Sequence, residues 1–291
     1  MKFGITFANT GHLSEPAVAT EFAKVAESLG FESLWASQHV VIPADHVSPC
    51  PYTQTGRMPG GDDVLIPDPL VWLGYIAAAT DTIRLATGTI IVPLLNPVVL
   101  AKQLATLDYL SGGRLEFGIG LGWLKEEFEA IGVPFEDRGA RADEYISAMR
   151  ALWTHPVASH HGKYINFDNC ILRPSPAQQS IPIHIGGNSV AAARRAGSFG
   201  DGFLPMTRDT TTLKSLSIEM RNAAIAVDRD LDDIEITVTT TLIGRHALPE
   251  IDILQGLGVT RILVPAGLFL DDPVSGVQKY HANVVAPFNG H

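Results

Sequence analysis

Short segments of alternating apolar and polar or small residues recur along the chain, and most precede a longer segment with helical spacing. At the start of the chain, for example, Phe3, Ile5 and Phe7 alternate with smaller or polar residues, as in a β-strand. The next apolar residues are three or four positions apart, as on one face of a helix. Strands are expected at residues 3–7, 33–37, 83–92, 115–119, 181–185, 202–205, 234–242 and 261–264.

This regular alternation of strands and helices predicts a parallel sheet with helices packed against it. Several of the strands are apolar throughout, which is typical of strands that are covered on both faces. Eight repeated units favour closure into a (β/α)8 TIM barrel, and an open doubly wound sheet is the alternative. A chain of 291 residues fits one such barrel, so a single domain over residues 1–291 is expected.

Two segments depart from the repeating pattern. Residues 40–69, approximately, are rich in proline and glycine and show no clear period. A loop of this length in a compact domain is usually functional, so we interpret it as a lid or a substrate wall. Residues 157–176, approximately, form short polar and aromatic pieces and are interpreted as an excursion, such as a hairpin, inserted between barrel units.

Composition and charge exclude several classes of function. The formal net charge of −10 disfavours nucleic-acid binding, and the chain contains no basic run suited to a membrane surface. No apolar stretch is long enough to span a membrane, and the N-terminus has no signal-peptide pattern. Cys50 and Cys170 lie far apart, which disfavours a disulfide framework. The expected protein is cytoplasmic and acts on a small molecule.

The C-terminal ends of barrel strands are where such folds place their active sites. The fourth strand ends in glycines, Gly120 and Gly122, followed by Trp123 and the acidic pair Glu126 and Glu127. Missing Cβ atoms allow another molecule to approach closely, and Glu126 is the candidate catalytic carboxylate. Few other carboxylates lie at strand ends, so a glycosidase with paired acids is disfavoured.

Histidines and serines narrow the choice of chemistry further. His39 follows the second strand and is either a catalytic or ring-contacting residue or a satisfied core histidine. No serine lies in a nucleophile-elbow pattern, so the sequence does not support acyl-transfer chemistry. His160 and His161 are adjacent and would point to opposite faces of an extended chain, so no metal site is expected.

Gly186 and Gly187 separate the fifth strand from an alanine-rich helix. Two glycines at a helix N-terminus expose backbone N–H groups, and the helix dipole adds positive potential. This pattern predicts a phosphate cradle, although Asn188 or Ser189 can also cap the helix without a phosphate. Arg208, after the next strand, can supply a positive charge or lie free on the surface.

These residues together resemble the luciferase-like monooxygenase superfamily of flavin- and deazaflavin-dependent α/β barrels. The resemblance covers essentially the whole chain, and its most specific part is Leu110–Leu115 with Gly118–Phe128. The other matching segments are Thr87–Pro97, Ala101–Asp108, Ile185–Ser189 and Asp201–Phe203.

The resemblance implies a cofactor whose tricyclic ring lies in the barrel mouth, and a homodimer. Members of the family often have a non-proline cis peptide behind the ring, which would fall here at about Thr89–Ile90. Trp123 would face the substrate, and His39 would polarise it or relay a proton. The implied cofactor-binding residues are Phe7, Thr89, Ile90, Gly120, Gly186, Gly187, Asn188, Ser189 and Arg208.

Three functions remain open from the sequence. The run from Gly122 to Phe128 resembles the branch that uses coenzyme F420, a deazaflavin that transfers hydride. An FMN-dependent monooxygenase supplied by a separate flavin reductase is the first alternative, and a non-catalytic flavin-binding barrel is the second. Sugar-phosphate dehydrogenases of the superfamily have acids where this chain has Gln38 and Trp123, so that substrate class is disfavoured.

Overall fold

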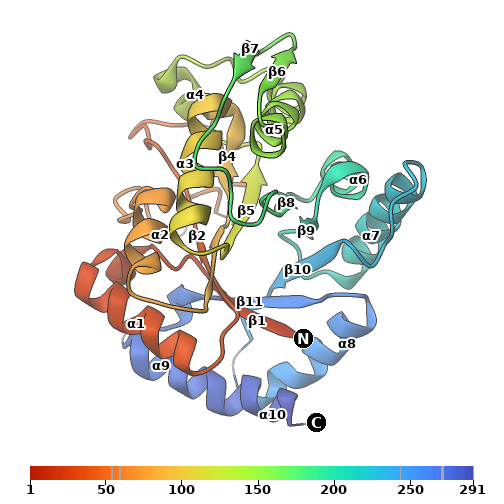
Figure 1. Ribbon diagram of the computed structural model, residues 1–291. Helices are drawn as coiled ribbons and strands as arrows, with labels where there is room; N and C mark the ends of the chain where they lie inside the picture. The colour runs from red at the N-terminus through yellow and green to blue at the C-terminus, as the bar shows by residue number, and fades with distance from the viewer. Residues whose placement is uncertain (54, 59, 243, 270–271, 291) are drawn as a thin grey trace.

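The described part of the chain contains a closed barrel of parallel strands (Figure 1). The computed structural model describes residues 1–53, 55–58, 60–242, 244–269 and 272–290. The strand order is β3-β2-β1-β11-β10-β9-β8-β5-β4, and an additional β3–β5 pairing closes the sheet. The barrel strands are β1 (Lys2–Thr6), β2 (Ser33–Ala36), β3 (Arg84–Thr87), β4 (Ile90–Ile91), β5 (Leu115–Gly120), β8 (Ile183–Gly186), β9 (Gly202–Leu204), β10 (Glu235–Thr239) and β11 (Arg261–Pro265). The predicted barrel is confirmed, and the open-sheet alternative is wrong.

Helices cover the outside of the barrel and bury its outward-facing side chains in the main core. Two of them begin as the sequence suggests: Asp68 and Asn96 each accept two backbone N–H groups, and each is followed by a proline. The helices are α1 (Pro16–Ser28), α2 (Pro69–Ala77), α3 (Pro97–Leu110), α4 (Lys125–Ile131), α5 (Arg138–Thr154), α6 (Val190–Phe199), α7 (Thr210–Ile225), α8 (Leu248–Gly256), α9 (Pro273–Tyr280) and α10 (Ala286–Asn289). None of the described helices has the length and apolarity needed to cross a membrane.

The third barrel strand is interrupted, although the sequence predicted one continuous strand over residues 83–92. It forms β3 and β4, and the cis peptide bond lies between Gly88 and Thr89. The expected position, about Thr89–Ile90, is therefore one residue too late. Gly88 packs closely on the neighbouring strand, since a Cβ there would lie 3.1 Å from the Cβ of Trp35.

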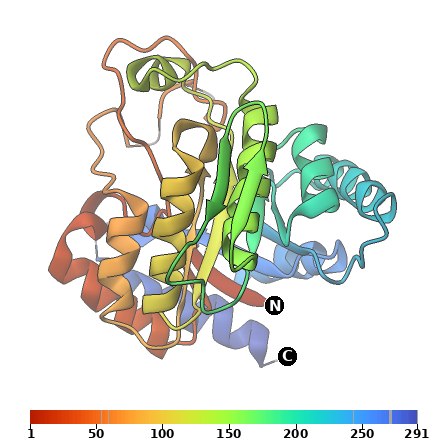
Figure 2. The ribbon, with the colours of Figure 1, turned by 45° about the horizontal axis from the view of Figure 1, so that its top comes forward.

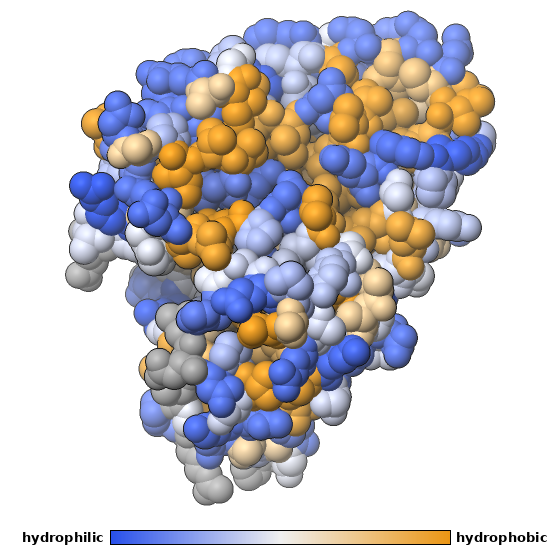
Figure 3. Space-filling model, turned by 90° about the vertical axis from the view of Figure 1, so that its left-hand side faces the viewer, coloured by the Kyte–Doolittle hydropathy of each residue, from blue (hydrophilic) through white to orange (hydrophobic). Residues whose placement is uncertain are grey.

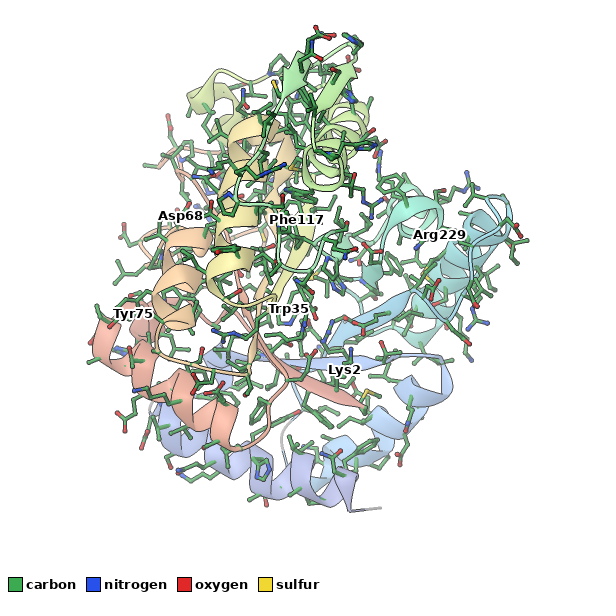
Figure 4. All side chains as sticks on the ribbon, viewed as in Figure 1. Lys2, Trp35, Asp68, Tyr75, Phe117 and Arg229 are labelled. Atoms are coloured by element: carbon green, nitrogen blue, oxygen red, sulfur yellow. The ribbon has the colours of Figure 1, made fainter. Side chains whose placement is uncertain are left out.

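The barrel interior has an apolar middle layer with a charged layer beneath it. Trp35 packs with Ala86, Leu204 and Leu263 in a small cluster separate from the main core. Because these residues come from strands on different sides of the barrel, they meet in its interior, and Figure 4 labels Trp35 in the middle of the molecule. The Arg261 guanidinium lies 5.3 Å from the Trp35 ring, on the side of the strands' N-terminal ends. Trp35 and its apolar neighbours thus separate this charged layer from the C-terminal ends of the strands.

Both irregular segments are present as separate features (Figure 2). The strands β6 (Ala158–His161) and β7 (Asn166–Cys170) pair in an antiparallel hairpin, as expected for the excursion. Its turn is held by Glu144, whose carboxylate accepts the N–H groups of residues 163–165. The segment between β2 and α2, which we call the long loop (residues 37–68), has no helix or strand among its described residues and runs beside α4.

Candidate functional site

Small residues at the strand C-termini leave a partly exposed floor above the apolar layer. Gly88, Gly120 and Gly186 come from three adjacent barrel positions and are partly exposed, as is Thr89 between them. A Cβ at Gly120 would lie 2.5 Å from the Thr89 Oγ1, and one at Gly186 would lie 2.9 Å from the Ile119 carbonyl oxygen. A side chain at these positions would collide with neighbouring protein atoms, so the glycines let the strand ends pack closely and leave backbone exposed on the floor.

Phe7 and Ile90, which were also expected to contact the cofactor ring, differ in their exposure. Phe7 directly follows β1 with a φ of 57°, a left-handed conformation that is rare for an aromatic residue and is found preferentially at functional sites. It is partly exposed at the mouth. Ile90, in contrast, is completely buried in the main core, so only its backbone is available to a ligand.

The glycine pair that was predicted to cradle a phosphate lies at the end of β8, the fifth strand position. Gly187 has a φ of 130°, which favours glycine, and Ser189 caps α6 by accepting the Ala192 N–H at 3.1 Å. Among the described residues, the N–H groups of Val190 and Ala191 have no hydrogen-bond acceptor. The helix N-terminus therefore retains free donors next to the two glycines.

Two polar side chains join the loops around this cradle. Asn188 accepts the Met206 N–H at 2.6 Å and donates to its carbonyl oxygen at 3.2 Å, which links the loops after β8 and β9. Arg208 donates from Nη1 to the Thr241 Oγ1 at 2.5 Å and so reaches the loop after β10. Asn188 is thus engaged by protein, whereas the exposed Arg208 keeps guanidinium donors for an anion.

His39 is held by a carboxylate that the sequence analysis did not select. Its Nδ1 lies 3.0 Å from Oε2 of Glu127, whose other oxygen accepts the Val40 N–H at 2.6 Å. The Glu127 side chain is completely buried, and 13% of the His39 side chain is exposed. The Trp123 ring packs edge-on against the imidazole with 5.9 Å between ring centroids. His39 is therefore an oriented imidazole beside an aromatic wall.

Glu126, the carboxylate that was expected to be catalytic, points to the long loop instead. Its Oε1 accepts the N–H groups of Val47 at 2.9 Å and Ser48 at 3.0 Å. Although desolvation opposes ionisation, these donors lower the pKa of Glu126 to about 2. The pattern of α4 explains the difference: Leu124 and Phe128 are buried, and Glu127 shares their inward face while Glu126 does not.

Asn9 fixes both ends of the long loop. Its side chain exchanges hydrogen bonds with the Ser37 backbone, accepting at 2.8 Å and donating at 2.9 Å, and donates to the Pro67 carbonyl oxygen at 2.9 Å. Glu126 and Glu127 hold the segment between these ends. The loop is therefore fastened to the barrel at its two ends and to α4 near its middle.

We predict that Glu126→Ala accelerates hydrogen exchange at the Val47 and Ser48 amides by about 10-fold or more, because their acceptor is removed. In the wild-type chain this protection should persist from pH 8 to about pH 5 and be lost as the pH falls towards 2, where Glu126 becomes protonated. The matched control is Glu129→Ala, which removes an exposed carboxylate paired with Lys125. Equal hydrogen exchange at these amides in both variants would contradict the role of Glu126 in holding the long loop.

A second polar cluster lies at the opposite end of the barrel. Arg261 is completely buried and contacts Glu32 at 2.9 Å, Glu116 at 3.0 Å and Glu235 at 3.0 Å. Glu116, Glu235 and His184 could in principle hold a metal ion, because one ligand atom of each lies within 4.8 Å of the others. The Arg261 guanidinium already contacts both of these carboxylates, so the protein supplies its own cation here.

Comparison with known proteins identifies the family. The family model described as luciferase-like monooxygenase matches residues 1–248. An uncharacterised Mycobacterium tuberculosis protein, Rv0953c, is 36% identical over 72% of this chain and 73% of its own length. An F420-dependent glucose-6-phosphate dehydrogenase of Kineococcus radiotolerans is 32% identical over 65% of this chain and 52% of its own. An FMNH2-dependent dimethylsulfone monooxygenase of Pseudomonas putida is 34% identical over 52% and 42%, respectively.

Solved structures share the fold over almost the full length. An F420-dependent secondary alcohol dehydrogenase, in complex with an F420-acetone adduct, aligns over 98% of both chains with a TM-score of 0.80 and 18% identity. The monooxygenase RslO1 from Streptomyces bottropensis aligns over 99% of this chain and 100% of its own, with a TM-score of 0.79 and 21% identity. At this level of identity the likeness concerns the barrel architecture.

Proposed function

Because this chain belongs to the luciferase-like monooxygenase family, whose members are F420- or FMN-dependent oxidoreductases and monooxygenases, we propose that it is an F420-dependent oxidoreductase. The observation that carries the proposal is the glycine-lined floor at the barrel mouth together with the free N–H donors at the start of α6. A flat ring and an anionic group on one ligand match these two features.

The residues at the barrel mouth fit a deazaflavin, which carries both a flat ring and a phosphate. The ring would lie over Gly120 and Gly186, next to Thr89 and Phe7, all of which are partly exposed. The phosphate would be held at Gly187 and the first turn of α6, with Arg208 adding positive charge. When bound, the deazaflavin supplies two-electron hydride transfer. The protein's own part is to orient the substrate and to move a proton through His39.

A parallel titration of the purified protein with F420 and with FMN, followed by cofactor fluorescence, tests the choice of cofactor. We expect F420 to bind at least about 10-fold more tightly than FMN, which corresponds to about 1.4 kcal/mol. Arg208→Gln should weaken F420 binding, because a cation near the anionic part of the ligand is lost. Tighter binding of FMN would overturn the assignment.

An FMN-dependent monooxygenase is the second candidate, and the similarity to a curated FMNH2-dependent monooxygenase favours it. In that case the protein would work with a separate flavin reductase, and oxygen would be consumed. Preferential FMN binding together with oxygen uptake in the presence of reduced flavin would support this function. Binding of a cofactor without any turnover would support the non-catalytic flavin-binding barrel, whereas failure to bind either cofactor would leave a barrel that resembles its family in fold alone.

We also propose that the protein forms a homodimer through the outer faces of α2 and α3. Val71 and Tyr75 on α2 and Val99 and Leu110 on α3 are largely exposed apolar side chains. Figure 3 shows apolar side chains exposed among hydrophilic ones on the side of the molecule where α1 and α2 lie. Because α2 and α3 are in contact, their exposed apolar side chains share one side of the molecule, where burial against a second copy would be favourable. Sedimentation of the wild type and of Val71→Lys would show a dimer and a monomer, respectively.

A further inference from the structure

We propose that Glu127 is a positioning residue that fixes the tautomer of His39, with the proton on Nδ1 and the lone pair on Nε2. The inference deepens the proposed function, since it assigns a direction to the proton that His39 moves. It rests on three contacts: Glu127 with the His39 ring, Glu127 with the Val40 N–H, and Trp123 with the His39 ring.

The first step concerns the hydrogen-bonding capacity of the carboxylate. An ionised carboxylate can only accept hydrogen bonds, and a backbone N–H can only donate one. The Val40 N–H occupies Oε1 at 2.6 Å, and Nδ1 of His39 faces Oε2 at 3.0 Å. The imidazole must therefore carry a proton on Nδ1 to bond Glu127, and in the neutral ring Nε2 is then unprotonated.

The second step concerns the orientation of the ring. Glu127 is completely buried on α4, and Trp123, on the loop before α4, packs on the imidazole at an interplanar angle of 80°. Within the described residues, Nε2 has no hydrogen-bond partner. The nitrogen with the free lone pair is consequently available to a ligand, while the opposite nitrogen is fixed.

The third step concerns the polar residue that precedes His39. Gln38 is already engaged, because its Oε1 accepts the Ile91 N–H at 2.7 Å. Glu127, on α4, thus provides the carboxylate that faces the His39 ring. If the proposed function holds, a substrate oxidised at this site loses a hydride to the deazaflavin and a proton to Nε2, which balances charge and electrons.

The test is ¹⁵N NMR of the imidazole nitrogens in the full-length cofactor-free protein, recorded near pH 8, above the usual histidine pKa of about 6.5. His39 signals are assigned by their loss in His39→Gln. We expect a protonated Nδ1 and an unprotonated Nε2 in the wild type. A protonated Nε2 in the wild type, in either the neutral or the charged ring, would overturn the proposal without the need for any variant.

Glu127→Gln sharpens the test because it keeps the size of the side chain. The Val40 N–H still requires an acceptor, so the amide oxygen should bond Val40 and the NH₂ group should face Nδ1. Nδ1 must then accept, and the proton should move to Nε2. The matched control is Glu126→Gln, whose amide oxygen can accept both Val47 and Ser48 and leaves the His39 tautomer as in the wild type.

The outcomes separate this proposal from the proposed function. An unchanged tautomer in Glu127→Gln, or the same change in both variants, would refute the role of Glu127. Failure to bind F420 would refute the proposed cofactor and leave the NMR result intact. A tautomer change restricted to Glu127→Gln supports the proposal whatever cofactor binds.

Discussion

Replacing His39 by alanine is expected to slow single-turnover hydride transfer by about 100- to 10,000-fold, the usual contribution of a positioned general acid or base. The variant loses an imidazole that is held by a buried carboxylate at the C-terminal ends of the barrel strands. The measurement mixes the F420-loaded protein with a substrate from a panel of small alcohols and carbonyl compounds and follows cofactor absorbance.

Two additional measurements make the result specific to proton transfer. F420 affinity should stay within about threefold of the wild type, since general acid–base catalysis acts on the transition state rather than on cofactor binding. His161→Ala removes an exposed hairpin imidazole and serves as the matched control. If His39→Ala retains the wild-type rate, His39 has no catalytic role.

The barrel was predictable because the buried positions of its strands and helices recur at regular intervals, and these intervals are visible in the sequence. Residues 115–119 and 181–185 were identified as strands for this reason, and β5 and β8 lie where they were expected. The break between β3 and β4 was harder to predict from the sequence. A glycine within the expected strand indicated an irregularity, but its exact position depends on packing of Gly88 against Trp35, which belongs to another strand.

The candidate site was predictable only in part, and the two acidic residues of α4 show why. The sequence analysis selected Glu126 and not its neighbour Glu127, although neighbouring helical positions differ in direction by about 100°. The buried positions Leu124 and Phe128 would have placed Glu127 inward, which is the pattern that identifies it. Its contact with His39 joins residues 88 positions apart and has no local signature in the sequence.

The charged layer beneath Trp35 is another long-range feature that the sequence did not reveal. Arg261, Glu32, Glu116 and Glu235 lie on or beside four different strands, and only barrel closure brings them together. Each of these charges depends on the others, because the cost of removing an ion from water must be offset by oppositely charged partners. Although burial opposes the ionisation of Glu116, the hydrogen bond with His184 and the charge of Arg261 hold the pKa of this carboxyl far below its usual range.

Arg261→Leu is therefore expected to destabilise the fold by about 3–5 kcal/mol, the usual cost of removing one partner from a buried ion pair. Leucine approximates the apolar part of the side chain but leaves the carboxylates without their shared cation. The measurement is urea unfolding at neutral pH. The control is Arg194→Leu, which breaks an exposed ion pair with Glu219 on the outer surface and should cost less than about 1 kcal/mol.

The pH dependence distinguishes loss of charge pairing from loss of packing. Because the pKa of Glu116 is lowered in the folded state, its stabilising contribution is present above the unfolded pKa of about 4.3 and declines as the pH falls below it. In Arg261→Leu the pKa of Glu116 loses a major lowering influence, so the difference in unfolding free energy from the wild type should be largest above pH 5 and smaller near pH 3. A difference that is constant with pH would show that Arg261 stabilises the barrel through packing against Trp35 rather than through its charge.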